Sequence, residues 1–148
     1  MKIYQAQPQD VDKILPLYLS YRKFYHVDAQ PEQAGDFLLK RLQLKESVIF
    51  FVEDDGKAVG FAQLYPLFCS LEMKRIWLLY DLFVDESARK KGVAEKLIVR
   101  AEQLAKETES AFIMLSTGTD NTNAQALYEK NGFVRDTDFY VYNKFLSQ

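Results

Sequence analysis

The sequence predicts a mixed α/β fold, and three features of the hydrophobic pattern indicate it. Segments of strand length alternate with segments of helical periodicity along the chain of 148 residues. A polar turn with a glycine, residues 54–57, joins two strand-like segments and predicts an antiparallel hairpin. A strand, loop, helix and strand over residues 78–116 predict a parallel pair. We therefore expect a mixed sheet with helices on both faces.

The first half of the chain is predicted to contain a strand, two helices and a hairpin. The first helix begins near Pro8 and Asp10, and Pro16 inside its periodic pattern predicts a bend or an early break. The second helix begins at Pro31 and continues to about Leu44. The strands are expected at residues 2–6, 48–53 and 58–66, and a less regular connector is expected at residues 67–74.

The second half is predicted to contain two further helices and a final hairpin. The strand at residues 78–84 is apolar except for Asp81, and the helix after it begins at Gly92 and ends near Thr108. A shorter helix ends at Asn131 and Gly132, a usual pair at helix C-termini. This short helix is expected at residues 123–130, and the remaining strands at residues 111–116, 133–135 and 139–145.

The composition favours a single soluble domain over residues 1–148. A chain of this length with 48% hydrophobic residues suffices for one core. The net charge of −2 argues against a nucleic-acid-binding surface, which is normally strongly basic. The single cysteine, Cys69, excludes a disulfide framework and a cysteine-based metal site, so no metal is expected. No apolar run reaches membrane-spanning length and no secretory signal is evident, so we expect a cytoplasmic protein.

The loop after the strand at residues 78–84 has the features of a phosphate site. Arg89, Lys90 and Lys91 precede a helix start, where the helix dipole normally favours acidic residues. Gly92 has no Cβ and lets the backbone approach a ligand closely. Free amide N–H groups together with these cations indicate a polyanion, most naturally phosphates. An ordinary solvated run of charges is the alternative interpretation.

Two separated motifs resemble those of the GNAT superfamily of N-acetyltransferases. Residues 89–94 match its acyl-CoA loop, Arg/Gln-x-x-Gly-x-Gly/Ala. Residues 121–133 resemble its second motif, Asn-x-x-Ala-x-x-Leu-Tyr-x-x-x-Gly-Phe. Either motif alone is a weak to moderate signal, but both in this order, separated by a helix and a strand, are specific. The resemblance implies an acetyltransferase with the GNAT acyl-CoA N-acyltransferase fold, whose central mixed sheet has about seven strands.

The resemblance also implies where acetyl-CoA, the cosubstrate, would bind. The backbone of Leu82 and Val84 would pair with the pantetheine arm, and the amides from Lys90 to Glu95 would hold the pyrophosphate. Asn121 would contact the cofactor, and Tyr128 would stand near its sulfur. The full set is Leu82, Phe83, Val84, Arg89, Lys90, Lys91, Gly92, Val93, Ala94, Glu95, Asn121, Asn123 and Tyr128, although Asn123 has the alternative role of a helix cap.

We expect direct attack by an acceptor amine on the acetyl thioester in a ternary complex, which needs no nucleophilic side chain. Tyr128, a neutral phenol at pH 7, is the candidate general acid toward the departing thiolate, and its alternative role is a core aromatic. Asp81 is the best-placed carboxylate for the general base, and its alternative role is a structural hydrogen-bonding group. The identity of the base stays open, because the polyamine-acetylating branch often has a carboxylate where this chain has Tyr80.

The acceptor is expected to be a small cationic amine, such as a polyamine, a diamine or a lysine-like amine. Aromatic faces and carboxylates suit such a cation, and the candidate residues are Tyr25, His26, Glu32, Tyr80 and Asp81. Two alternatives stay open, namely acetylation of protein lysines or N-termini, and acyl-CoA binding by a regulatory module without turnover. The resemblance implies a homodimer, formed through the C-terminal strand or residues 67–74, and we expect neither nucleic acid nor a membrane as a partner.

Overall fold

A computed structural model describes residues 1–147, and they form two compact units. The first unit, Met1–Ser116, contains a sheet of five strands with its helices. The second unit is Thr117–Gln148, and its residues up to 147 contain one helix. The single domain over residues 1–148 stays a prediction. No helix within residues 1–147 combines the length and the apolar character needed to cross a lipid bilayer.

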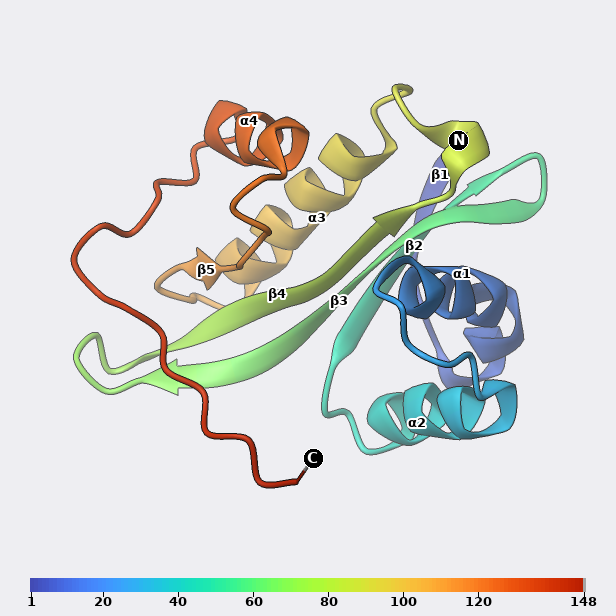
Figure 1. Ribbon diagram of the computed structural model, residues 1–148, viewed down its shortest axis with the longest axis horizontal. Coiled ribbons are helices and arrows are strands. Elements are labelled where there is room, and N and C mark those ends of the chain that lie inside the picture. The colour runs from blue at the N-terminus through green and yellow to red at the C-terminus, as the bar shows by residue number, and fades with distance from the viewer. Residues whose placement is uncertain (148) are drawn as a thin grey trace. The chain divides into compact units, whose positions relative to one another are not determined.

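The sheet is mixed and its strands follow one another in chain order. β1 to β4 are joined by antiparallel pairing, and β4 and β5 are parallel, so the predicted mixed sheet is confirmed (Figure 1). The tight turn between β2 and β3 has positive φ angles at Asp55 and Gly56, as a two-residue hairpin requires. The strands are β1 (Lys2–Gln5), β2 (Val48–Asp54), β3 (Lys57–Cys69), β4 (Lys74–Val84) and β5 (Ile113–Met114).

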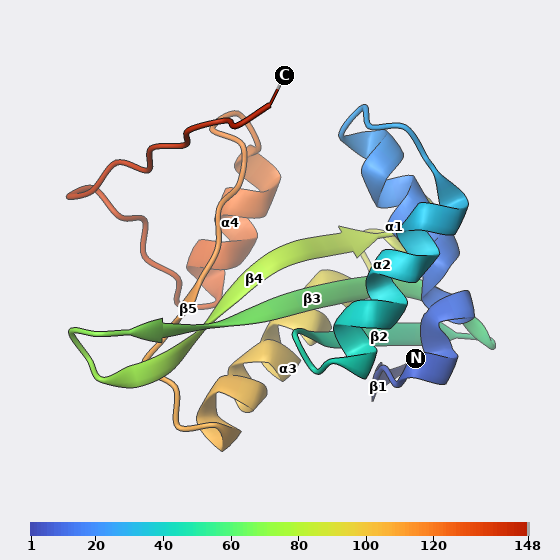
Figure 2. The same cartoon turned by 90° about the horizontal axis from the view of Figure 1, so that it is seen from below.

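Helices of the first unit cover both faces of the sheet, as the sequence predicts. Figures 1 and 2 show α1 and α2 on one face and α3 on the opposite face. The helices of the first unit are α1 (Val11–Phe24), α2 (Pro31–Gln43) and α3 (Val93–Glu107), and short 3-10 turns are η1 (Pro8–Asp10) and η2 (Glu86–Ala88). In the second unit, α4 spans Thr122–Lys130.

Alternation along the strands builds a separate apolar layer on each face. Phe61 of β3 packs with the aromatic rings of Tyr18 and Tyr21 from α1. On the opposite face, the guanidinium of Arg100 in α3 lies 4.3 Å from the ring centroid of the fully buried Phe50. Residues 49–52 of β2 are buried on both faces, which explains their continuous apolar run.

Gly60 of β3 allows α3 to begin close to the sheet. A Cβ at this position would lie 2.6 Å from Cγ1 of Val93, the first residue of α3, and 3.4 Å from the carbonyl oxygen of Phe83. Any larger residue therefore has to push the start of α3 or the end of β4 away. Gly60 was not among the residues predicted to matter, although a glycine inside a strand pattern often marks a close approach.

The two predicted C-terminal strands are wrong for the described residues, and the sheet has five strands rather than about seven. Residues 133–135 and 139–145 have no strand assignment. Their apolar alternation fits a strand, but a strand also needs a partner for its N–H and C=O groups. The side chains of Phe139, Tyr140 and Tyr142 are instead at least 80% exposed.

Two smaller expectations in the first unit also differ from the structure. α1 continues through Pro16 to Phe24, because the buried side chains of Ile14 and Leu17 hold it against the sheet despite one missing hydrogen bond. The predicted irregular connector at residues 67–74 is instead a tight turn at residues 70–73 between longer strands β3 and β4.

Replacement of Gly60 by alanine tests its role as a close contact. Because the new Cβ meets Val93, we expect Gly60→Ala to lower the free energy of unfolding by about 1–3 kcal/mol. Gly35→Ala, inside α2, is the matched control. Its new Cβ would lie 3.6 Å from the Leu15 side chain of α1, which is an ordinary van der Waals contact. This control should raise the stability by about 0.5–1 kcal/mol. Urea unfolding measures both, and wild-type stability of Gly60→Ala would contradict the contact.

Candidate active site

β4 extends beyond its parallel neighbour and leaves part of its edge without a strand. β5 pairs only with Trp77 and Leu78, whereas β4 continues to Val84. Among residues 1–147, no strand pairs with this edge of β4 after Leu78. Unpaired main-chain groups on a strand edge can bind an extended ligand in the manner of an added strand.

A β-bulge at Tyr80 changes the face on which the following side chains lie. Leu79 pairs with Leu64 of β3, and Asp81 pairs with the adjacent residue Gln63, so Tyr80 is the extra residue on β4. Cross-strand partners share a face, and the adjacent residues Leu64 and Gln63 lie on opposite faces. Leu79 and Asp81 therefore lie on opposite faces although they are two residues apart. The bulge places Asp81 on the face covered by α1.

The same bulge determines which main-chain groups of β4 point to the open edge. Before the bulge, the N–H of Trp77 donates to the carbonyl of Phe112 on the β5 side, at 3.2 Å. After the bulge, the N–H of Asp85 donates to a β3 carbonyl at 2.8 Å. Because successive residues alternate in direction, the main-chain groups of Leu82 and Val84 point away from β3. These are the two residues whose backbone was predicted to bind pantetheine.

The loop from β4 to α3 ends in a helix start with available amides. Lys90 and Gly92 have φ angles of 63° and 78°, and Lys96 donates to the carbonyl of Gly92 at 3.0 Å. By helix geometry, the amides of Val93 and Ala94 have no acceptor inside α3. The side chains of Lys90 and Lys91 are exposed at this positive end of the helix dipole. The predicted phosphate-binding features therefore lie together.

Side chains at both ends of this loop hold its conformation. Asp85 accepts hydrogen bonds from the hydroxyl and, at 3.2 Å, the N–H of Ser87, and the hydroxyl bond is the main cause that lowers the pKa of Asp85. The Nε of Arg89 donates to the carbonyl of Val84 at 3.1 Å, and its guanidinium lies 5.7 Å from the ring centroid of Phe83. Arg89 thus holds the loop against the end of β4. Because Arg89 bonds to the carbonyl of Val84, the N–H of Val84 stays available for a ligand.

A buried row of polar side chains crosses the α1 face of the sheet. The hydroxyl of Ser47 donates to Oε1 of Gln63 at 2.7 Å, and Nε2 of Gln63 donates to Oδ2 of Asp81 at 2.8 Å. All three residues are buried, with Gln63 fully so. Burial raises the pKa of Asp81, while hydrogen bonds from Gln63 and Tyr21 oppose that rise. Asp81 is therefore a carboxylate with an unusually high proton affinity.

Phenol rings form the remaining surroundings of Asp81. Burial raises the pKa of Tyr18, Tyr21 and Tyr65, and the charge of Asp81 adds to each rise. These phenols are therefore neutral and able to donate hydrogen bonds. Tyr65 contacts the exposed ring of Tyr80, with ring centroids 5.9 Å apart. The site combines one acidic group with several aromatic faces.

The predicted acceptor residues lie in different surroundings. Tyr80 and Asp81 lie at the bulge, and the ring of Tyr25 contacts Tyr21, a hydrogen-bond donor to Asp81, with centroids 5.2 Å apart. His26 is an exposed residue of the connector between α1 and α2, with a φ angle of 61°. Glu32 lies in the first turn of α2.

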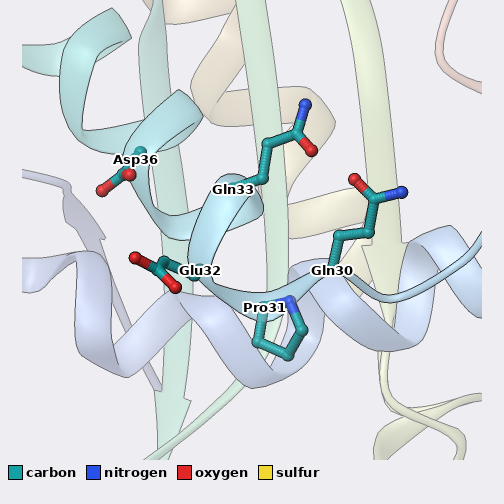
Figure 3. A pocket seen from close by; sticks show the side chains of 5 residues that line it. All are labelled: Gln30, Pro31, Glu32, Gln33 and Asp36. Carbon is teal, nitrogen blue, oxygen red and sulfur yellow. The ribbon is translucent and has the colours of Figure 1, made fainter.

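Glu32 lines a shallow pocket of about 430 Å³ at the start of α2. Figure 3 shows the carboxylates of Glu32 and Asp36 extending to the same side of the helix, with Gln30 and Gln33 elsewhere on the rim. This pocket has an acidic wall, whereas the Asp81 surroundings are aromatic. Within residues 1–147, no three His, Cys, Asp or Glu side chains gather in a way that would hold a metal ion.

The second unit carries the predicted residues of the second motif on α4. Asn121 caps the helix, since its side chain accepts a hydrogen bond from the N–H of Ala124 at 3.1 Å. Asn123 is exposed in the first turn. The ring of Tyr128 packs against Phe133, with centroids 5.9 Å apart, and is partly buried. The roles of these residues toward a cofactor stay predictions.

Sequence reasoning missed the hydrogen-bonding partners of Asp81. Gln63 and Ser47 were not singled out, although a glutamine inside the apolar run of β3 is a recognisable signal for a buried polar contact. Tyr21 was likewise not predicted as a partner of Asp81. The bulge that brings these side chains to Asp81 leaves no mark in an apolar strand sequence.

Nearly the whole chain is similar to known proteins of one family. A family model described as acetyltransferase (GNAT) family matches residues 12–133. An uncharacterized N-acetyltransferase, YhfO, of Bacillus subtilis (strain 168) is 42% identical over 142 residues, which cover 96% of this chain and 95% of the relative. A probable acetyltransferase of Haemophilus influenzae is 32% identical over 134 residues, or 90% of either chain. The crystal structure of a probable acetyltransferase, 43% identical, covers 100% of this chain and 99% of its own, with a TM-score of 0.95.

The raised pKa of Asp81 predicts a pH-dependent stability. Above its ordinary value of 3.8 and up to its raised pKa, the folded chain binds more protons than the unfolded chain. The contribution of Asp81 to the free energy of unfolding therefore falls as the pH rises through this window, by up to about 1.4 kcal/mol per pH unit. Asp81→Asn lacks the titrating group, so its stability relative to wild type should rise with pH.

Urea unfolding of both proteins between about pH 4 and pH 8 measures this difference. Asp55→Asn, in the exposed β2–β3 turn, is the matched control for the loss of one carboxylate at a position that is not buried. A difference between Asp81→Asn and wild type that stays constant over the same range would show that Asp81 does not titrate abnormally.

Proposed function

The chain belongs to the GNAT family of acetyltransferases, and from that premise we propose transfer of an acetyl group from acetyl-CoA to the primary amine of a small cationic acceptor. Membership of this family makes the chain an N-acetyltransferase enzyme that uses acetyl-CoA. The observation that carries the proposed acceptor class is Asp81, a buried carboxylate among phenol rings beside the open edge of β4. A polyamine, a diamine or a lysine-like amine has the matching chemistry.

The groups of the first unit fit a nucleotide diphosphate joined to an extended arm. Amides at the start of α3 and the exposed side chains of Lys90 and Lys91 suit the two phosphates. The main-chain groups of Leu82 and Val84 on the open edge suit the amides of pantetheine. When bound, acetyl-CoA supplies an acetyl group already activated as a thioester. The chain then has only to hold the acceptor amine in place and manage its proton.

Asp81 is the proposed general base for the acceptor. A protonated alkylamine, with a pKa near 10, has to lose a proton before it can attack. A carboxylate whose pKa is raised by burial accepts that proton, directly or through one water, more readily than an ordinary aspartate. The faces of Tyr65 and Tyr80 suit the cationic form of the same amine. Asp81 thereby combines recognition of the charge with removal of the proton.

Tyr128 is the proposed general acid toward the departing CoA thiolate. A phenol is neutral at pH 7 and can donate its proton. The match of residues 121–133 to the second family motif supports this role, since Tyr128 occupies the motif's tyrosine position. Its partly buried ring on α4 is compatible with a hydroxyl that reaches a ligand.

A homodimer is the proposed assembly. Apolar side chains are exposed at the turn between β3 and β4, where Phe68 is 76%, Leu71 is 96% and Met73 is 88% exposed. Exposed apolar residues in one place favour a protein contact. A second copy of the chain would cover them and match the assembly that the family resemblance implies.

An amine-panel assay of CoA thiol release tests the proposed function. We expect acetyl-CoA consumption that depends on an added polyamine or diamine and gives a product with one added acetyl mass. Little release with neutral amines would support the role of Asp81 in recognising charge. Acetylation of a lysine peptide in preference to every small amine would contradict the acceptor class, and CoA binding without any acceptor-dependent release would contradict catalysis.

Two variants extend the same assay to the proposed acid and base. Tyr128→Phe should lower kcat by about 10²-fold or more with little change in acetyl-CoA affinity. Tyr142→Phe is its control, because Tyr142 is 90% exposed in the same unit. Asp81→Asn should lower kcat/KM for the amine, and the loss should shrink at high pH, where the amine is already deprotonated. Unchanged turnover in either active-site variant would remove the corresponding role.

A further inference from the structure

The side chain of residue 63 determines which group donates and which accepts in the hydrogen bonds next to Asp81. Gln63 lies directly opposite Asp81 on the neighbouring strand and is fully buried. Its Nε2 group donates to Oδ2 of Asp81 at 2.8 Å, and its Oε1 accepts from the Ser47 hydroxyl at 2.7 Å. Turning the amide over would place Oε1 against an ionised carboxylate, and two acceptors in contact repel each other.

The row also lies beside an apolar core. Ser47, Gln63 and Asp81 lie on the face where Ile49, Phe61 and the helices α1 and α2 form an apolar core. In such surroundings, an ionised carboxylate needs donors to replace the water that it has lost. Each buried polar side-chain atom within residues 1–147 has a hydrogen-bond partner, so none in the row is left unpaired.

We infer that Gln63, anchored by Ser47, is a positioning residue for the reaction, one that keeps Asp81 ionised and fixes the direction of its carboxylate. The inference rests on the proposed function, because it assigns Gln63 a role through the proposed base. Gln63 is fully buried and would act through Asp81 rather than on the acceptor itself. Its donated hydrogen bond lowers the proton affinity that burial raises, and so sets the pH above which Asp81 can accept a proton.

The charged and titratable groups around Asp81 come from four elements. α1 contributes Tyr18 and Tyr21, and Tyr21 donates a second hydrogen bond to Asp81. β3 contributes Tyr65, and β4 itself contributes Tyr80. From α2, Arg41 acts electrostatically on Tyr18 and Tyr65. Burial raises the pKa of Tyr18, Tyr21 and Tyr65, so the amide of Gln63 and the hydroxyl of Tyr21 are the groups that stabilise the charge of Asp81 near neutrality.

The direct test is the titration of the Asp81 carboxyl carbon by ¹³C NMR in the free protein, which requires no activity. In Gln63→Met, a variant of similar volume without the donor, the pKa of Asp81 should rise by about one to two pH units. The acid limb of the pH profile of kcat/KM should move upward by the same amount. Leu64→Met is the matched control, since Leu64 is an equally buried neighbour on the opposite face of β3. It should leave both measurements unchanged.

Gln63→Glu provides a second test that keeps the shape of the side chain. Two carboxyl groups in contact share one proton, so one titration should move to still higher pH. If the Asp81 titration stays at its wild-type pH in Gln63→Met, or in Gln63→Glu where the first variant does not fold, the inference is overturned. Asp81→Asn separates the two claims. Full activity in that variant removes the proposed base, whereas lost activity with an unmoved titration in Gln63→Met removes only the role of Gln63.

Discussion

The part of β4 that continues beyond its parallel neighbour is the constraint on which the rest of the site depends. β5 accompanies β4 for two residues and then ends, so the main chain of β4 up to Val84 has one free edge. The strand leads directly into the loop and the amino end of α3, where further amides are available. A ligand with an extended arm joined to a diphosphate could therefore be held by main-chain groups along one continuous stretch of chain. Gly60 maintains this arrangement by letting α3 begin against the sheet.

One extra residue in β4 affects both the main-chain groups proposed to bind the donor and the position of Asp81, the proposed base. The bulge at Tyr80 turns the main-chain groups of Leu82 and Val84 to the open edge, and it also places Asp81 on the α1 face beside Gln63. A regular strand would put Asp81 on the face with Leu79 and would change which residues present their backbone. Acetyl-donor binding and acceptor deprotonation are thus proposed to depend on the same irregularity. The buried row from Ser47 to Asp81 then stabilises a charge that an apolar face would otherwise exclude.

The fold was predictable to the extent that local patterns determine it. The hairpin turn with Gly56, the start of α3 at Gly92 and the parallel strand after it all follow from turn residues, glycine and hydrophobic periodicity. The expected strands at residues 133–135 and 139–145 were wrong, because apolar alternation shows only that a segment can form a strand, and a partner strand decides whether it does.

The site was predictable only in part. The family motifs pointed to Leu82 and Val84, but no residue type marks a bulge within a run of apolar residues, so the reason for their orientation required the structure. Gln63 was missed for a related reason. A hydrogen bond across two strands depends on register, which residue spacing along one strand does not reveal.

The central claim is that main-chain amides of β4 and of the start of α3 hold the donor, and amide hydrogen exchange tests it most directly. Exchange is measured with no ligand, with adenosine 3′,5′-bisphosphate and with coenzyme A. The account predicts that coenzyme A protects the amides of Leu82, Val84 and the first residues of α3. The bisphosphate, which lacks the pantetheine arm, should leave Leu82 and Val84 unprotected. Equal exchange at Leu82 and Val84 with and without saturating coenzyme A would contradict the account.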